Sequence, residues 1–252
     1  MYKKWKIAIT AFAVSVLGVS PGALAQDDGP QVGPVELFAC TFEDDKGYED
    51  LAKINQRFAK WAKKNDPSYS AWTITPNFRQ NDGEFDIGWI GGWSEGGAAM
   101  GRGKDKWAKS NDGLADDYWE VLDCSHSLVS SVPINAPDGS PDNGLVMFSS
   151  CTLEEGKTPA DSFPAHKKFS DDMVAMGGKG QSWLMYPALG FGKIEYDYYA
   201  VTSFRNNEEL GEAWDLYTNG GGYEKAMAAM DGIVSCDSPR VYDARLVVGN
   251  AK

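Results

Sequence analysis

The sequence of 252 residues is poor in the side chains that most often hold metals or haem. It contains only two histidines, His126 and His166, and four cysteines, none of which form a CxxC motif. Structural zinc sites need closely spaced Cys or His ligands, and a haem iron needs an axial ligand such as His. We therefore expect neither a bound metal nor a cofactor.

Long apolar runs are also scarce. An apolar run covers residues 7–19, which is short for a bilayer span, and no later run approaches membrane-spanning length. Three lysines precede this run, and an Ala-Leu-Ala sequence ends at Ala25. This pattern predicts a secretory signal peptide over residues 1–25 rather than an uncleaved anchor helix. We expect a mature chain without a membrane span, exported to the periplasm or the medium.

The sequence has fewer basic than acidic residues. Lys and Arg number 24 against 36 Asp and Glu, which gives a formal net charge of −12. Such a surface repels phosphate backbones and anionic lipid headgroups. Nucleic acid and membrane surfaces are therefore not expected as partners.

One short sequence occurs twice, 111 residues apart. It is CTFEDDK at residues 40–46 and CTLEEGK at residues 151–157. The same offset relates further pairs of like residues: Phe58 to Phe169, Trp72 to Trp183, Pro76 to Pro187 and Asp86 to Asp197. We interpret the chain as two copies of one domain, residues 34–132 and 144–249. A Pro-rich linker, residues 133–143, joins them.

The cysteines follow the same repeat. An even number in an oxidising compartment predicts two disulfides, for which three pairings exist. The repeat favours one bridge inside each copy, Cys40 with Cys124 and Cys151 with Cys236. Each bridge closes a long loop, which contributes roughly 4 kcal/mol in the chain-entropy account.

Periodicity gives each copy the order strand, helix, strand, strand, helix, strand. In the first copy the strands are expected at residues 35–42, 71–75, 85–93 and 128–132. The third strand is apolar on both faces, so both faces should be covered. This order is the split βαβ pattern of the ferredoxin-like fold.

Two such units in tandem resemble the dimeric α+β barrel superfamily. The resemblance implies an α+β fold in which the two sheets pair within the chain as a pseudo-dimeric barrel. The superfamily includes cofactor-free monooxygenases of the antibiotic-biosynthesis type and haem proteins such as chlorite dismutases and dye-decolourising peroxidases. A haem member would need His126 or His166 as its axial ligand.

Aromatic side chains on the strands are the candidates for a ligand site. Large aromatic groups either fill a core or border a pocket for an apolar ligand. The residues that we expect beside such a pocket are Trp72, Trp183, Tyr186, Trp89, Tyr198 and His166.

The chain contains no Ser/His/Asp triad or phosphate-binding glycine loop that we can identify. Our first expectation is therefore an exported, non-catalytic protein that binds a small apolar or aromatic ligand or a partner protein. The alternatives are a cofactor-free monooxygenase-like enzyme and a structural subunit of a surface assembly. The sequence does not decide whether the chain is an enzyme, nor its oligomeric state.

Overall fold

A computed structural model describes residues 31–78, 85–110, 112–136 and 141–249. The expected signal peptide, residues 1–25, lies outside the described residues. Within the described part, none of the helices combines the length and apolar character that crossing a membrane requires.

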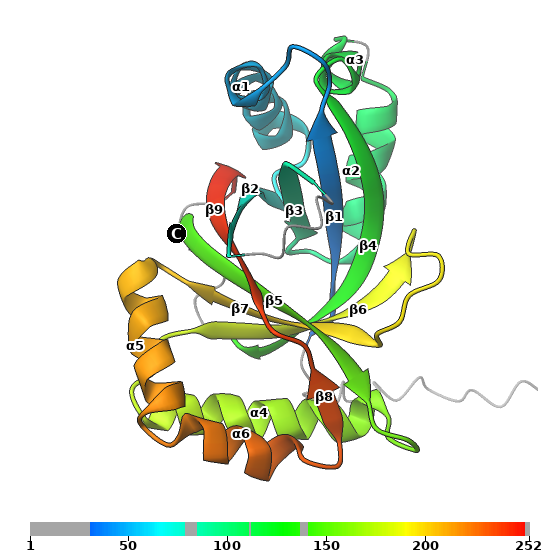
Figure 1. The fold of residues 1–252 in the computed structure, drawn as a ribbon. Coiled ribbons are helices and arrows are strands. Elements are labelled where there is room, and N and C mark those ends of the chain that lie inside the picture. Colours follow the sequence, from blue (N-terminus) through cyan, green and yellow to red (C-terminus); the bar gives the residue numbers. More distant parts are fainter. Residues whose placement is uncertain (1–30, 79–84, 111, 137–140, 250–252) are drawn as a thin grey trace, which may run out of the picture.

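The chain folds as two successive runs of strands and helices (Figure 1). The elements of the first run are β1 (Gly33–Phe42), α1 (Tyr48–Asn65), β2 (Tyr69–Phe78), β3 (Ile87–Trp93), α2 (Gly97–Ala108), α3 (Leu114–Trp119) and β4 (Leu122–Asn135). The elements of the second run are β5 (Asn143–Leu153), α4 (Pro159–Ala175), β6 (Gln181–Leu189), β7 (Tyr198–Phe204), α5 (Asn207–Thr218), α6 (Gly222–Met230), β8 (Val234–Cys236) and β9 (Arg240–Val248).

Eight strands close into one antiparallel barrel. The strand order is β7-β6-β4-β1-β3-β2-β9-β5, and pairing between β7 and β5 closes the barrel. The short strand β8 also pairs with β5. The two runs meet where β4 pairs with β6 and β2 pairs with β9. The predicted α+β class and the predicted barrel are therefore confirmed.

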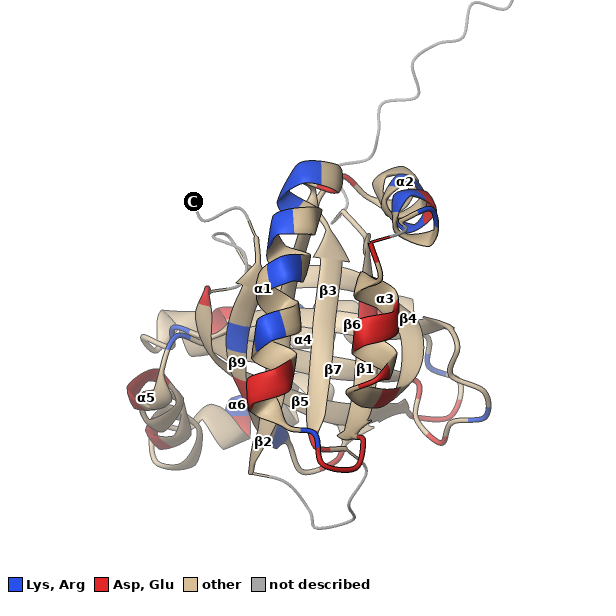
Figure 2. Ribbon diagram, turned by 90° about the horizontal axis from the view of Figure 1, so that it is seen from above, with Lys and Arg blue, Asp and Glu red and all other residues tan. Residues whose placement is uncertain are grey.

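Helix α1 forms because its apolar residues recur on one face. Leu51, Ile54, Phe58 and Ala62 are buried against the barrel. The basic residues lie on the opposite face, where Figure 2 shows them along the outer side of the helix. The helix ends at Asn65, and Pro67 follows two residues later.

The barrel interior is an apolar core that both halves share. Ile74 and Val129 from the first half pack there with Val146 and Met185 from the second. Val129 is completely buried, and Trp183 lies at the edge of the same cluster. The space between the paired sheets is thus occupied by side chains of the protein itself.

Strand β4 is longer than the residues 128–132 that periodicity predicts. It begins at Leu122 and ends at Asn135, so it includes Cys124 and the first three residues of the expected linker. Cys40 and Cys124 are directly opposite in the β1–β4 pair, as are Cys151 and Cys236 in the β5–β8 pair. Both disulfides are formed as the repeat predicted.

Candidate functional site

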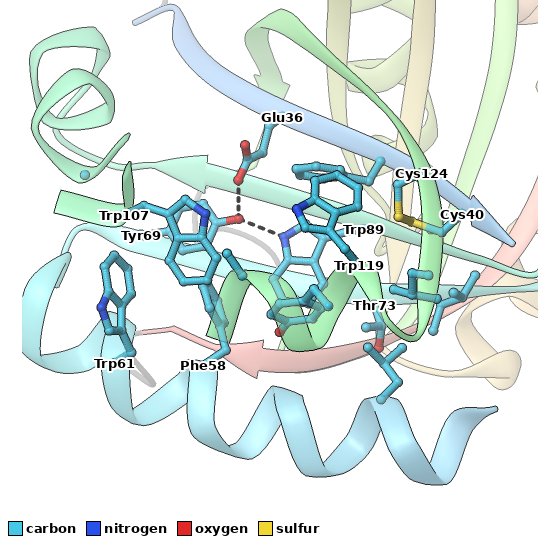
Figure 3. Close-up of a pocket in the computed structure, with 18 of the residues that line it drawn as sticks. Glu36, Cys40, Phe58, Trp61, Tyr69, Thr73, Trp89, Trp107, Trp119 and Cys124 are labelled. Atoms are coloured by element: carbon cyan, nitrogen blue, oxygen red, sulfur yellow. Dashed lines mark hydrogen bonds between the residues drawn. A yellow bond between two sulfur atoms is a disulfide. The ribbon is translucent and has the colours of Figure 1, made fainter. Parts of the chain in front are cut away.

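A cavity of about 160 Å³ lies on the outer side of the barrel in the first half. Its floor is formed by β1, β2 and β3, and helices α1, α2 and α3 cover it (Figures 1 and 3). Along β1 the side chains alternate, so Glu36, Phe38 and Cys40 face this cavity, whereas Val35 and Leu37 pack in the barrel interior. The Cys40–Cys124 disulfide forms part of the cavity wall.

Aromatic side chains make up most of the remaining wall, with Phe58 at their centre (Figure 3). The Phe58 ring centroid lies 5.3 Å from that of Trp89 and 5.6 Å from that of Trp107, both edge to face. Trp61 and Trp107 meet across the two helices at 4.9 Å. Edge-to-face packing of this kind holds rings rigidly and presents flat apolar surfaces to a ligand.

A glycine in β3 allows a polar group to reach the cavity floor. Gly91 lies between Ala71 of β2 and Glu36 of β1 in the strand register. A Cβ atom at Gly91 would overlap the hydroxyl group of Tyr69. Because Gly91 has no side chain, the Tyr69 side chain crosses β3, and its hydroxyl donates a hydrogen bond of 2.5 Å to Glu36 Oε1.

Glu36 is the centre of a buried charged cluster. Its Oε2 atom accepts from Lys104 Nζ and lies 3.0 Å from His126 Nε2. Burial raises the pKa of the Glu36 carboxyl, but the bond to His126, the Lys104 ammonium and the Tyr69 hydroxyl together hold that pKa below its usual value. The Tyr69 hydroxyl also accepts from Trp89 Nε1 at 2.7 Å, which joins the cluster to the aromatic wall (Figure 3).

His126 connects this cluster to solvent. Its ring stacks on Phe38 with centroids 3.9 Å apart. The His126 side chain is 42% exposed, whereas that of Glu36 is 6% exposed. The buried Glu36 carboxylate is therefore hydrogen-bonded to a side chain that reaches water.

The aromatic residues and the histidine that we expected beside a ligand pocket lie at three different places in the structure. Trp89 lines the cavity of the first half. Trp183 packs at the edge of the barrel interior, and Trp72 donates from Nε1 to the carbonyl oxygen of Pro141 at 2.9 Å. Tyr186, Tyr198 and His166 come together beneath α4 in the second half.

In the second half, buried side chains of β7 and α4 meet. Tyr198 is fully buried, and its hydroxyl lies 3.0 Å from His166 Nε2. Burial lowers the pKa of His166 to about 4, so the ring is neutral near pH 7. His166 also lies beside the Cys151–Cys236 disulfide, whose sulfur atoms are bonded to each other.

Sequence reasoning missed Glu36, Tyr69 and Lys104 because it looked for residues that recur. The positions 111 residues after Glu36, Tyr69 and Gly91 hold other residue types: Met147, Gly180 and Thr202. In the strand register Glu36 pairs with Gly91, and Met147 pairs with Thr202. The sequence feature that could have revealed the site is Glu36, the one acidic residue in the otherwise mostly apolar strand β1.

The site does not fit haem. A cavity of about 160 Å³ is close to the engineered cavity of about 150 Å³ that holds benzene, and a porphyrin is far larger. His126 does not line this cavity; its Nε2 bonds Glu36 and its ring stacks on Phe38. His166 is buried against Tyr198 in the other half.

Comparison with solved structures finds the same fold elsewhere. A candidate monooxygenase from Lactobacillus acidophilus superimposes with a TM-score of 0.53 at 13% identity, over 86% of this chain and 95% of that one. A haem-binding protein from Thermus thermophilus gives 0.51 at 10% identity, over 86% and 92%. A candidate chlorite dismutase gives 0.50 at 12% identity, over 86% and 95%.

No protein-family model matches the sequence, and no curated protein matches it. Our first expectation, a non-catalytic binding protein, is corrected by these structural neighbours, which are described as enzymes or as a haem-binding protein. That expectation rested on the lack of known catalytic motifs, and the buried Glu36 cluster belongs to none of them. The closed barrel, its helices and these neighbours identify the fold of the chain as that of the dimeric α+β barrel superfamily.

Proposed function

We propose that the chain is a monooxygenase-type enzyme that oxidises a small, electron-rich aromatic compound with O₂ and needs no bound cofactor. The observation that carries this proposal is the cavity of about 160 Å³, with aromatic walls and a charged cluster on its floor. Small-molecule sites are typically apolar hollows with a few convergent polar groups. The monooxygenase among the structural neighbours supports the reaction class by analogy of fold.

Without a cofactor, the substrate has to supply every electron. When a phenol becomes a quinone, its ring C–H and O–H groups together give four electrons to O₂. One oxygen atom stays in the product, and the other leaves as water with both hydrogens. Such a substrate must lose a proton before oxygen attacks, so the site needs a route for that proton.

The Glu36 cluster provides this route in our proposal. The aromatic wall excludes water and orients the ring, while Lys104 and the Tyr69 hydroxyl hold the Glu36 carboxylate in place. Glu36 lines the cavity and its Oε2 atom lies 3.0 Å from Nε2 of the half-exposed His126, so the carboxylate stands between the substrate and solvent. Each of these groups has a position fixed by more than one contact.

The finer architecture and the location also belong to the proposal. The shared strand register supports two tandem ferredoxin-like units, residues 34–132 and 144–249, joined by residues 133–143. The two disulfides are typical of an oxidising compartment. They support export, with residues 1–25 as the signal peptide.

Oxygen uptake tests the activity. We expect the purified chain to consume O₂ with at least one member of a panel of single-ring phenols and hydroquinones. Glu36→Gln should lower the rate roughly 100-fold, because it removes the charge that organises the proton route. Glu209→Gln is the matched control, since Glu209 is also buried but pairs with Arg205 in the second half.

No oxygen uptake at high enzyme concentration with any of these compounds would reject the proposal. Haem is tested separately by titrating haemin into the purified protein and recording the absorption spectrum. We expect no Soret shift that saturates at one equivalent. A saturable shift would contradict the fit argued from the cavity.

A further inference from the structure

A second carboxylate faces the same cavity and takes no part in the Glu36 cluster. Asp66 follows α1 as its C-cap residue and is 8% exposed. Its Oδ2 atom accepts from Trp93 Nε1 at 2.7 Å, and its Oδ1 atom accepts from the Ser68 hydroxyl at 3.3 Å. Both donors are neutral groups.

The charges around the cavity therefore do not cancel. Glu36 is paired with Lys104 and bonded to His126. Among the residues that the structure describes, no Lys, Arg or His lies within 4.0 Å of the Asp66 carboxylate. The lining thus holds two carboxylates and one ammonium group, and a buried negative charge is costly unless a cation joins it.

The aromatic wall suits a cation as well. The Lys104 ammonium lies 5.5 Å from the Trp93 ring centroid and 5.9 Å from that of Phe38. These distances are within the range in which an ammonium group is attracted to a ring face. The protein already places one of its own ammonium groups against this wall, so a ligand's ammonium would find the same kind of surface.

Close packing keeps Asp66 in place. A Cβ atom at Gly103 of α2 would overlap Asp66 Oδ2 and would lie 3.1 Å from Trp93 Nε1. The glycine allows α2 to approach the carboxylate without displacing it. Asp66 is therefore held at the wall by the helix in addition to its two hydrogen bonds.

We propose that the substrate of this pocket is a small arylalkylamine in its cationic form, with its ring among the side chains around Phe58 and its ammonium group at Asp66. The cavity volume matches one six-membered ring with a short arm. This inference names the substrate class for the activity proposed above and rests on that proposal's placement of the substrate.

Three compounds of similar shape and different charge test the inference: benzylamine, benzyl alcohol and benzoate. We expect calorimetry at pH 7 with the full mature chain to show benzylamine binding at least about 10-fold more tightly than benzyl alcohol, and benzoate more weakly than both. Methylamine measures the general attraction of an acidic protein for cations, and it should bind more weakly than benzylamine.

Asp66→Asn should remove the preference for the amine, while Glu209→Gln, a buried carboxylate of the second half, should retain it. If Asp66→Asn fails to fold, the wild-type series alone decides. Equal affinity for benzylamine and benzyl alcohol would overturn the inference, as would an amine preference that survives in folded Asp66→Asn.

Oxygen uptake distinguishes the two proposals. Uptake with neutral phenols but no preference for amines would reject the arylalkylamine and leave the oxygenase activity standing. A preference for amines that depends on Asp66, without uptake of oxygen, would uphold the ligand class and reject the oxygenase.

Discussion

His166 is a residue whose burial links stability to pH. Its pKa in the folded protein is about 4, against about 6.5 for an exposed histidine. As the pH falls, the unfolded chain takes up the proton first, so stability is complete above about pH 6.5 and is lost as the pH falls towards 4.

We therefore expect this histidine to cost the wild-type chain roughly 2 kcal/mol of stability between pH 7 and pH 5. His166→Asn introduces the residue type found 111 positions earlier, at Asn55, and should show a smaller loss over the same interval. Urea denaturation of both proteins at the two pH values measures the difference. Equal losses in the two proteins would show that His166 is not buried as described.

At this scale the sequence predicted little of the site. Trp89 was among the candidates because aromatic strand residues are conspicuous, and it does line the cavity. The Tyr69–Glu36 hydrogen bond depends on Gly91, because a side chain at that position would overlap the Tyr69 hydroxyl. A hydrogen bond between β1 and β2 that passes over β3 has no local signature in the chain.

Among the elements, helix α2 contains two interior glycines, Gly101 and Gly103, in different surroundings. A Cβ atom at Gly101 would meet no atom within 4 Å, whereas one at Gly103 would overlap the Asp66 carboxylate. The first glycine only weakens the helix, and the second is required by packing.

Gly101→Ala should accordingly raise the free energy of unfolding by about 0.5–1 kcal/mol, the difference in helix propensity. Gly103→Ala should lower it by about 1–3 kcal/mol, because the new methyl group displaces Asp66 or α2. Chemical denaturation of the two variants measures both effects. Stabilisation by both substitutions would contradict the close approach of α2 to Asp66.

Elements with a strong local pattern were predicted well, and others were not. Strand β1 was expected at residues 35–42 and spans Gly33–Phe42, and β3 was expected at residues 85–93 and spans Ile87–Trp93. The first half of β4, from Leu122 to Ser127, is mostly polar and gives no alternation. Its extended form comes from pairing with β1 along its whole length, which is a long-range contact.

The whole molecule is held together by a barrel that neither half can close alone. Residues from both halves fill its interior, and the halves are joined by β4–β6 and β2–β9 pairing. Separating the halves would expose that core and four strand edges.

Unfolding should therefore be one cooperative transition. Tryptophan fluorescence reports mainly the first half, which contains most of the described tryptophans, and far-UV circular dichroism reports both halves. We expect the two signals to give the same urea midpoint. Two separate midpoints would mean that the halves are independent domains.

For the molecule as a whole, the sequence repeat predicted the barrel but did not reveal the candidate site. Cys40 and Cys151, like Trp72 and Trp183, recur 111 residues apart, and the sequence repeat therefore pointed to the disulfides. Glu36 and Tyr69, which form the polar floor of the cavity, have no counterpart at that spacing. A search for recurring residues therefore could not find the candidate site.

The most direct test of the account is the rate of oxygen uptake after the cavity has been filled from α3. Ala115 lines the cavity, and Ala175 is exposed at the end of α4. With a substrate that the wild-type chain oxidises, Ala115→Phe should lose most of the uptake and keep the wild-type circular dichroism, while Ala175→Phe should keep both. Unchanged uptake by folded Ala115→Phe would show that the chemistry takes place elsewhere.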